Sequence, residues 1–350
     1  MQQNDKTVLP QTWCPYCNSR EYDIVEQQPD IRYHPDEKFY VCKCAECKIL
    51  FTAPILPENE IGKYYPDSYG AYAFKNNIDK IFDKIKHQPQ VRNFPTDLLE
   101  RYRKNLAQEL AGKYIEKIFY RTANFFIAQY FNLNRKQPVP YYNKIPKTDQ
   151  KKKYLHLGSG HPAIFAQYMY HDGYEVHNID INKPICDAYR AVGVTSNYGT
   201  VTSAQYPENY FDYIYAGHVV EHFLHPREEL KKLHSWLSEN GVFICSFPLY
   251  ETVEFSYKKP YYDVPRHTIH LTRKTAKMIF KDAGFAIEKI SFPPYGWALQ
   301  LNRNFYDYLH NPSFDHDSWN KPLNEKYYRI SYLLSLFRQS GNPVYFLKKR

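Results

Sequence analysis

Residues 154–180 read YLHLGSGHPAIFAQYMYHDGYEVHNID, and this stretch decides the fold. Its pattern predicts four elements in turn: a strand at 154–157, a glycine turn at 158–160, a helix at 162–171 and a second strand at 175–179. The second strand ends on Asp180. Such a succession is typical of a βαβ unit that binds a nucleotide, because the glycines let a ligand approach the backbone and the acid can bind ribose hydroxyls.

A later segment, residues 211–226, extends this pattern with FDYIYAGHVVEHFLHP. It predicts a strand with Phe-Asp at its entry, followed by a Glu-His pair and a helix. Together the two segments resemble the class I S-adenosylmethionine-dependent methyltransferases over roughly residues 151–292, in the group that carries Glu-His and then Pro after this strand. The resemblance implies an α/β fold with a Rossmann-like sheet of seven strands, and S-adenosylmethionine as the cofactor.

The resemblance also implies which residues contact the cofactor. The glycine turn would face its methionine half, and Asp180 would hold its ribose. The full set of expected contacts is Leu157, Gly158, Ser159, Gly160, His161, Asp180, Ile181, Ala216, Gly217 and His218. Two features depart from the family: Pro162 replaces the usual third glycine, and the loop at 199–203 has no acid for the adenine amine. They keep open a catalytically inactive binding or scaffold protein that retained the fold.

The Glu-His pair, Glu221 and His222, is the expected catalytic centre. The similar sugar C-methyltransferases use this histidine as a general base, and an imidazole can take a proton from a hydroxyl or from carbon beside a ketone. Glu221 would orient His222 or bind substrate, and a purely structural His222 is the alternative. His218, Glu221 and His222 also match an inverted zinc-protease motif. We reject that reading, because the segment follows a Rossmann-type strand and Pro226 would cut a helix short.

Five of the seven cysteines lie within residues 14–47. Two Cys-x-x-Cys pairs predict a structural zinc ribbon, because four thiolates complete a tetrahedral shell and so small a module needs a metal to fold. Cys42 is then the spare cysteine. The expected zinc ligands are Cys14, Cys17, Cys44 and Cys47. Disulfides and a redox pair are the competing interpretations, but nothing suggests secretion and no thioredoxin-like pattern surrounds the pairs.

The chain divides into three expected parts. A zinc ribbon covers residues 1–60, a linker and helical segment covers 61–150, and the methyltransferase domain covers 151–350, with a lid insertion at 294–340. Apolar residues at three- and four-residue spacing indicate helices from 74 to about 130. These helices would form a cap over the cofactor cleft or, alternatively, an oligomerisation element.

Substrate contacts are expected from two segments. A zinc ribbon followed by a Tyr-Tyr-Pro-x-x-Tyr stretch is similar to zinc-ribbon methyltransferases of sugar and natural-product pathways. There, tyrosines of this linker reach the active site, which implicates Tyr65 and Tyr69, with packing at a domain junction as the alternative. In related enzymes a histidine-rich segment borders the pocket, so Arg266, His267 and His270 are further candidates. Arg266 could hold a phosphate or a carboxylate.

Composition narrows the partners. The chain has 350 residues and a net charge of +9 at pH 7, which permits an anionic partner, although scattered Lys and Arg fit a generally basic surface as well. No apolar run approaches ~18 residues and the start lacks a signal peptide, so we expect a cytoplasmic protein without a membrane span. The expected acceptor is a small molecule, with a sugar or sugar nucleotide favoured. An RNA methyltransferase is the alternative, but it would more often show a concentrated basic stripe. The sequence does not give the oligomeric state.

Overall fold

The computed structural model describes residues 9, 12–66, 151–159, 173–191, 193–294, 296–311, 313–315, 318–319, 321 and 324–350. Three expected site residues, Tyr69, Gly160 and His161, lie outside this part of the chain, as do the helices expected at 74–130 and 162–171.

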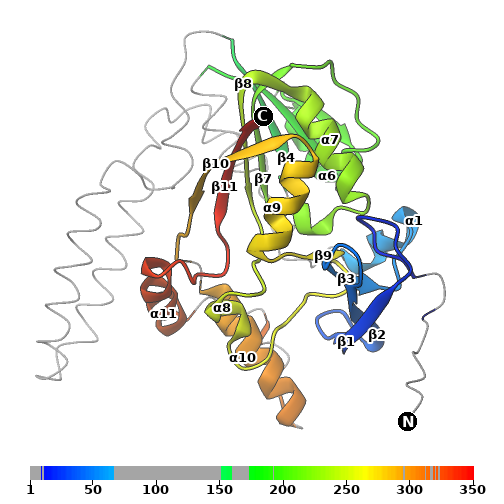
Figure 1. The fold of residues 1–350 in the computed structure, drawn as a ribbon, viewed down its shortest axis with the longest axis vertical. Helices are drawn as coiled ribbons and strands as arrows, with labels where there is room; N and C mark the ends of the chain where they lie inside the picture. Colours follow the sequence, from blue (N-terminus) through cyan, green and yellow to red (C-terminus); the bar gives the residue numbers. More distant parts are fainter. Residues whose placement is uncertain are drawn as a thin grey trace, which may run out of the picture.

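A seven-stranded sheet forms the centre of the larger domain (Figure 1). Its order is β10-β11-β8-β7-β4-β5-β6. The strands are β4 (Lys153–Leu157), β5 (Glu175–Asp180), β6 (Thr195–Tyr198), β7 (Phe211–Gly217), β8 (Leu237–Ser246), β10 (Phe285–Ser291) and β11 (Val344–Lys349). Strands β4 to β8 pair in parallel, whereas β11 runs antiparallel to both of its neighbours. The Rossmann-like sheet of seven strands predicted from the sequence is therefore confirmed.

Helices follow the strands where the sequence signals place them. They are α6 (Lys183–Ala191), α7 (Pro226–Trp236) and α9 (Arg273–Asp282). Pro226 begins α7, where a missing N–H costs nothing. Thr272 caps the start of α9 with a capping box. Its hydroxyl accepts a hydrogen bond from the Thr275 backbone N–H, and the Thr275 hydroxyl accepts one from the Thr272 backbone N–H. In the middle of the sheet Ile214 and Phe243 are fully buried, as expected for parallel strands covered on both faces.

The segment expected as a lid insertion, 294–340, contains α10 (Trp297–His310) and α11 (Glu325–Leu336). A buried carboxylate ties both helices to the short helix α8 (Val253–Ser256). Glu254 of α8 accepts hydrogen bonds from the Gly296 N–H at 2.6 Å, the Gly341 N–H at 2.7 Å and the Ser331 hydroxyl at 2.8 Å. One acidic side chain thus satisfies donors from three separate segments.

The N-terminal ribbon forms a second sheet with the order β1-β2-β3-β9. Its strands are β1 (Tyr22–Asp30), β2 (His34–Cys44), β3 (Leu50–Ala53) and β9 (Ile269–His270), followed along the chain from β3 by α1 (Glu58–Ile61) and a 3₁₀ turn, η1 (Gly62–Tyr64). The strand β9 comes from the larger domain, and Figure 1 shows it beside the blue ribbon strands.

The ribbon and the larger domain also share one hydrophobic core. A single cluster of buried side chains includes Ile49 and Phe51 of the ribbon together with Leu157 and Cys245 of the seven-stranded sheet. Thr52 strengthens the junction, because its N–H donates to the Thr268 carbonyl at 3.0 Å and its hydroxyl to the His267 carbonyl at 2.6 Å. The ribbon therefore supports the loop that carries His267. Within the described ranges, no helix has the length and apolar character needed to cross a membrane.

Candidate cofactor and acceptor site

A cavity of about 860 Å³ lies at the carboxyl ends of β4, β5, β6 and β7. This edge is where ligands bind in open α/β sheets. The structure brings ten of the residues expected from the sequence to its wall: Tyr65, Leu157, Gly158, Ser159, Asp180, Ile181, Gly217, His218, His222 and His267. Ala216 is fully buried in β7 and is not among the lining residues, so its expected cofactor contact is not supported.

The glycine turn after β4 requires its first glycine. Gly158 has φ +56°, in the left-handed region that favours glycine. A Cβ added there would lie 2.6 Å from Cγ2 of Val219. The Gly158 N–H donates to the Ile179 carbonyl at 2.8 Å, which joins the turn to the end of β5. The backbone can therefore come close to a ligand at this corner.

Asp180 holds a fixed carboxylate at the tip of β5. Its Oδ1 accepts from the Asn182 N–H at 2.8 Å, and its Oδ2 accepts from the Ser159 hydroxyl at 3.3 Å. The residue is nearly buried yet lines the cavity. Farther along this wall, the loop at 199–203 contributes backbone and hydroxyl groups in place of an acid.

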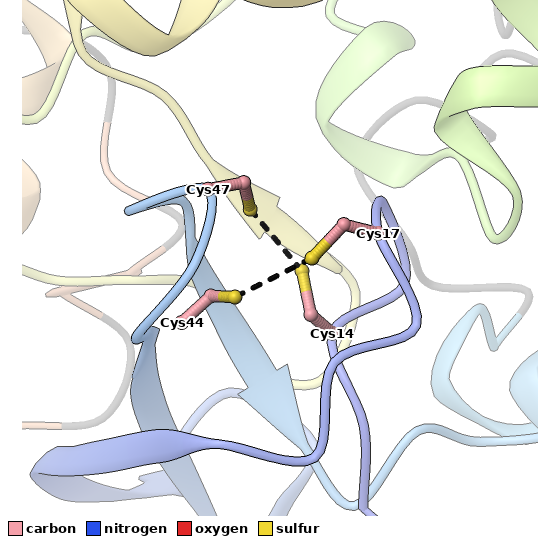
Figure 2. A group of neighbouring side chains, drawn as sticks. All are labelled: Cys14, Cys17, Cys44 and Cys47. Atoms are coloured by element: carbon pink, nitrogen blue, oxygen red, sulfur yellow. Dashed lines mark hydrogen bonds between the residues drawn. The ribbon is translucent and has the colours of Figure 1, made fainter.

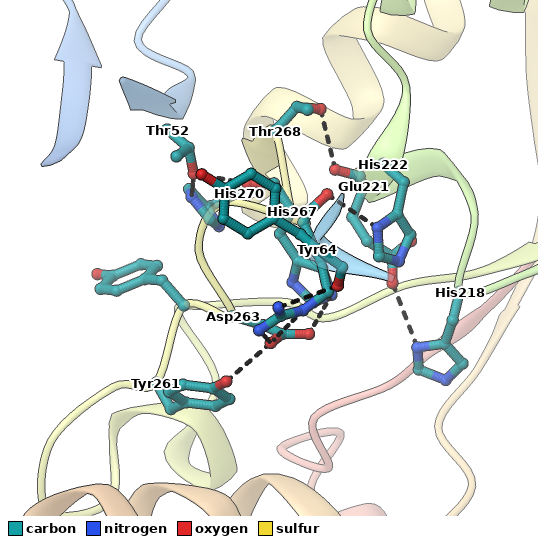
Figure 3. Close-up of polar contacts among 12 residues, drawn as sticks. Thr52, Tyr64, His218, Glu221, His222, Tyr261, Asp263, His267, Thr268 and His270 are labelled. Atoms are coloured by element: carbon teal, nitrogen blue, oxygen red, sulfur yellow. Dashed lines mark hydrogen bonds and ion pairs between the residues drawn. The ribbon is translucent and has the colours of Figure 1, made fainter. Parts of the chain in front are cut away.

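His222 lies in a 3₁₀ turn, η7 (Val220–His222), directly after β7. Its Nδ1 is 2.9 Å from the Arg266 carbonyl oxygen and 2.9 Å from the Tyr65 hydroxyl. A carbonyl oxygen can only accept, so Nδ1 carries the ring proton and Nε2 carries the lone pair. Figure 3 shows the His222 ring beside His267, with its hydrogen bond to the loop that carries His267. The geometry leaves Nε2 as the basic atom.

Glu221 stands behind His222 and away from the cavity. Only 1 % of its surface is exposed, and its Oε1 is 3.2 Å from Nδ1 of His218 (Figure 3). Its Oε2 is buried with no hydrogen-bond partner in the described part of the chain. Burial alone would raise the pKa of Glu221, but the hydrogen bond from His218 and the imidazoles of His222 and His267 hold it below its usual value. An ionised carboxylate here favours positive charge on the neighbouring imidazoles.

His267 faces the cavity beside His222. Their ring centroids are 4.7 Å apart, edge to face, and Nδ1 of His267 is 2.9 Å from the Tyr250 hydroxyl. Burial, reinforced by His222, lowers the pKa of His267 to about 4. The ring is therefore neutral at pH 7 and can make hydrogen bonds without adding charge to the cavity.

The expectation that Arg266 binds a substrate anion is wrong. Arg266 is fully buried, and its five N–H groups all donate within the protein: to Asp30, to Asp263 and to the Tyr64 carbonyl. No donor is left for a ligand. His270 is also fully buried, with Nε2 3.0 Å from the Thr52 hydroxyl, so it too does not contact the cavity.

Replacing Asp30 by Ala should destabilise the protein by about 3–5 kcal/mol, because Arg266 would keep a buried charge with one carboxylate fewer. Urea denaturation measures this change. Asp36→Ala, at an exposed position of the same hairpin, serves as the control and should change stability by less than about 0.5 kcal/mol. Equal effects of the two substitutions would contradict a structural role for the Asp30–Arg266 pair.

Four cysteines of the ribbon converge on one point. The Sγ atoms of Cys14, Cys17, Cys44 and Cys47 all lie within 4.8 Å of one another, with Cys14–Cys47 and Cys17–Cys44 both at 3.5 Å (Figure 2). Tetrahedral zinc–thiolate bonds of about 2.3 Å place sulfur atoms about 3.8 Å apart. The cluster therefore fits a zinc ion. Cys42 is buried in β2 and is not part of the cluster.

Sequence analysis missed several residues of the cavity wall. They are Arg32, Tyr250, Phe255, Tyr261 and Asn342. None of them belongs to a motif, and they come from the ribbon, from the segment that precedes His267 and from the residues before β11. Only the fold brings them together.

Comparison with known proteins agrees with this fold. Residues 130–290 match the family model Methyltransf_23, described as a methyltransferase domain. A search of curated proteins found no match. Similar solved structures include an S-adenosylmethionine-dependent methyltransferase from Mesorhizobium loti. It is 14 % identical to this chain, the match covers 59 % of this chain and 94 % of that chain, and the TM-score is 0.40. A TehB-like methyltransferase from Corynebacterium glutamicum is 16 % identical, with 73 % of this chain and 98 % of that chain covered and a TM-score of 0.36. The 1,6-didemethyltoxoflavin-N1-methyltransferase of Burkholderia thailandensis is 12 % identical, with 57 % of this chain and 72 % of that chain covered and a TM-score of 0.37.

The sheet order, the reversed strand β11 and the matched domain define the α/β methyltransferase fold. The chain therefore carries a methyltransferase domain.

Proposed function

We propose that the enzyme methylates a small molecule, a sugar or a sugar nucleotide, with His222 as the general base. One observation carries the proposal: His222, with Nε2 as its basic atom, lines the same cavity as the glycine turn and Asp180. A base and a cofactor corner in one cavity suit transfer to an acceptor that must lose a proton.

The cofactor would occupy the half of the cavity beside β4, β5 and β6. Asp180 would accept hydrogen bonds from the ribose hydroxyls, and the backbone at Gly158 and Ser159 would face the methionine end. The loop at 199–203 would border the adenine. Bound S-adenosylmethionine supplies an electrophilic methyl group at its sulfonium centre.

The chain's own residues would handle the proton. Nε2 of His222 would take it from the acceptor while the acceptor atom bonds to the methyl carbon and the carbon–sulfur bond breaks. The Arg266 carbonyl holds the Nδ1–H and fixes the ring. The buried Glu221 carboxylate would stabilise the imidazolium that forms, and the Tyr65 hydroxyl would help to orient the ring. Glu221 would thus act on the reaction through His222 and not by touching the acceptor.

We also propose that the four-cysteine cluster binds a structural zinc ion. The metal would fix the ribbon that presents β3 to β9 and so supports the His267 loop. It lies outside the residues that line the cavity, so its role would be structural.

Calorimetry with S-adenosylmethionine and S-adenosylhomocysteine tests the cofactor site. We expect micromolar binding to the wild type, and binding weaker by about tenfold to a hundredfold in Asp180→Ala, the cost of a hydrogen bond to a charged group. Asp187→Ala, at an exposed position on α6, is the control and should bind normally. Positive binding opens an acceptor screen, sugar nucleotides first. A folded wild type that binds neither compound would overturn the proposal in favour of an inactive scaffold.

A further inference from the structure

Arg32 places a positive charge in the cavity wall. It lies in the turn between β1 and β2, so the ribbon itself supplies this part of the wall. Tyr261, Phe255 and Leu301 of the larger domain line the same cavity. The side chain is half-buried, and it belongs to none of the motifs that the sequence offers.

The guanidinium of Arg32 is held in a way that leaves its donors available. Its central carbon is 5.5 Å from the centroid of the Tyr33 ring, a cation–π contact that uses no N–H group. Among the residues that the structure describes, Arg32 has no hydrogen bond and no ion pair. Arg266, whose central carbon lies 5.1 Å from the same ring, has by contrast used all five donors.

Charge balance alone is the competing explanation. Asp30 and Asp263 carry two negative charges and Arg266 one positive charge, so Arg32 makes the group neutral. Burial would lower the pKa of Arg32, but Tyr261 and Asp263 raise it overall, and the guanidinium stays charged. A balancing charge would gain most by pairing directly, yet no carboxylate oxygen of the described chain lies within ion-pair distance of Arg32. The described chain does not close off the N–H groups of Arg32, so a ligand oxygen in the cavity can accept hydrogen bonds from them.

We propose that Arg32 binds an oxyanion of the methyl acceptor, a phosphate or a carboxylate, and thereby restricts the enzyme to anionic acceptors. A guanidinium fork matches either group with two parallel hydrogen bonds. Apolar and aromatic side chains around it strengthen such a pair by limiting water. This inference rests on the proposed function, because it names the substrate class of the same cavity.

The test uses the full-length protein with bound zinc, saturated with S-adenosylhomocysteine. Calorimetry at low salt measures binding of uridine diphosphate for the phosphate arm, galacturonate for the carboxylate arm, and uridine as the neutral probe. Arg32→Gln should weaken binding of the anionic probe by about tenfold or more, and Arg32→Lys by less, because lysine keeps the charge without the fork. Arg20→Gln, at an exposed position of the ribbon, is the matched control and should leave probe binding unchanged.

The results with the two anionic probes distinguish a phosphate from a carboxylate on the acceptor. Selective loss of uridine diphosphate binding identifies a phosphate-bearing acceptor, and selective loss of galacturonate binding identifies a carboxylate. The inference is overturned if neither anion binds to protein that binds S-adenosylhomocysteine. It is also overturned if Arg32→Gln lowers the melting temperature but leaves probe affinity unchanged, the result that charge balance alone predicts. A wild type that fails to bind S-adenosylhomocysteine refutes the proposed function instead.

Discussion

Replacing His222 by Asn is expected to lower kcat by about two to four orders of magnitude, the usual contribution of a general base. An Asn amide can still donate to the Arg266 carbonyl, so the turn should keep its shape while Nε2 is lost. The measurement is the rate of S-adenosylhomocysteine release with an acceptor from the screen.

His225→Asn is the matched control for this substitution. His225 is exposed in the same segment, and its backbone N–H, unaffected by the change, donates to Glu229. The control should keep wild-type kcat, and both variants should bind S-adenosylhomocysteine normally. A kcat loss of equal size in the two variants, or a parallel loss of cofactor affinity in His222→Asn, would assign His222 a purely structural role.

Replacing Cys44 by Ala should remove the metal and unfold the ribbon. Binding of structural zinc contributes an apparent free energy of about 10–16 kcal/mol to the folding of small modules at pH 7. With only three thiolate ligands left, the variant cannot complete the tetrahedral zinc shell. Because β3 pairs with β9, the His267 loop should loosen with the ribbon and kcat should fall as well. Elemental analysis and thermal unfolding measure both effects.

Cys42→Ala distinguishes metal loss from simple core damage. Cys42 is as buried as Cys44 but is not part of the cysteine cluster. It should retain one equivalent of zinc and lose about 1 kcal/mol of stability, typical of a small core truncation. Zinc retained at full occupancy by Cys44→Ala, or zinc absent from the wild type, would refute the proposed ligand set.

Most of the fold could be predicted from short sequence patterns. The strands predicted at 154–157 and 175–179 are visible within a few residues of sequence, and the structure confirms them as β4 and β5. Asp180 and His222 were predictable for a related reason. Asp180 ends one parallel strand and His222 closely follows another, and in this topology such strand ends meet at one edge of the sheet.

Long-range electrostatics could not be predicted in the same way. Arg266 looked like a ligand for substrate anions. Asp263 lies only three residues before it, but the second carboxylate, on Asp30, lies 236 residues away in the sequence, so no local pattern shows that all the donors of Arg266 are used. Arg32 showed the reverse: an ordinary turn residue reaches the cavity only because the ribbon packs against the larger domain. The strand β9 has two residues, too few for any periodic pattern, and exists because Leu50 and Phe51 pair with it.

The shared sheet also sets an order of events on the ribosome. The ribbon is synthesised before the larger domain, but Thr52 and its acceptor at His267 are 215 residues apart, so the nascent ribbon must wait for its fourth strand. Until then the outer edge of β3 is an open template for pairing with other chains, and Asp30 has no guanidinium to neutralise it. Contacts at such separations are slow to form. The ribbon is thus made before the larger domain but is completed only together with it.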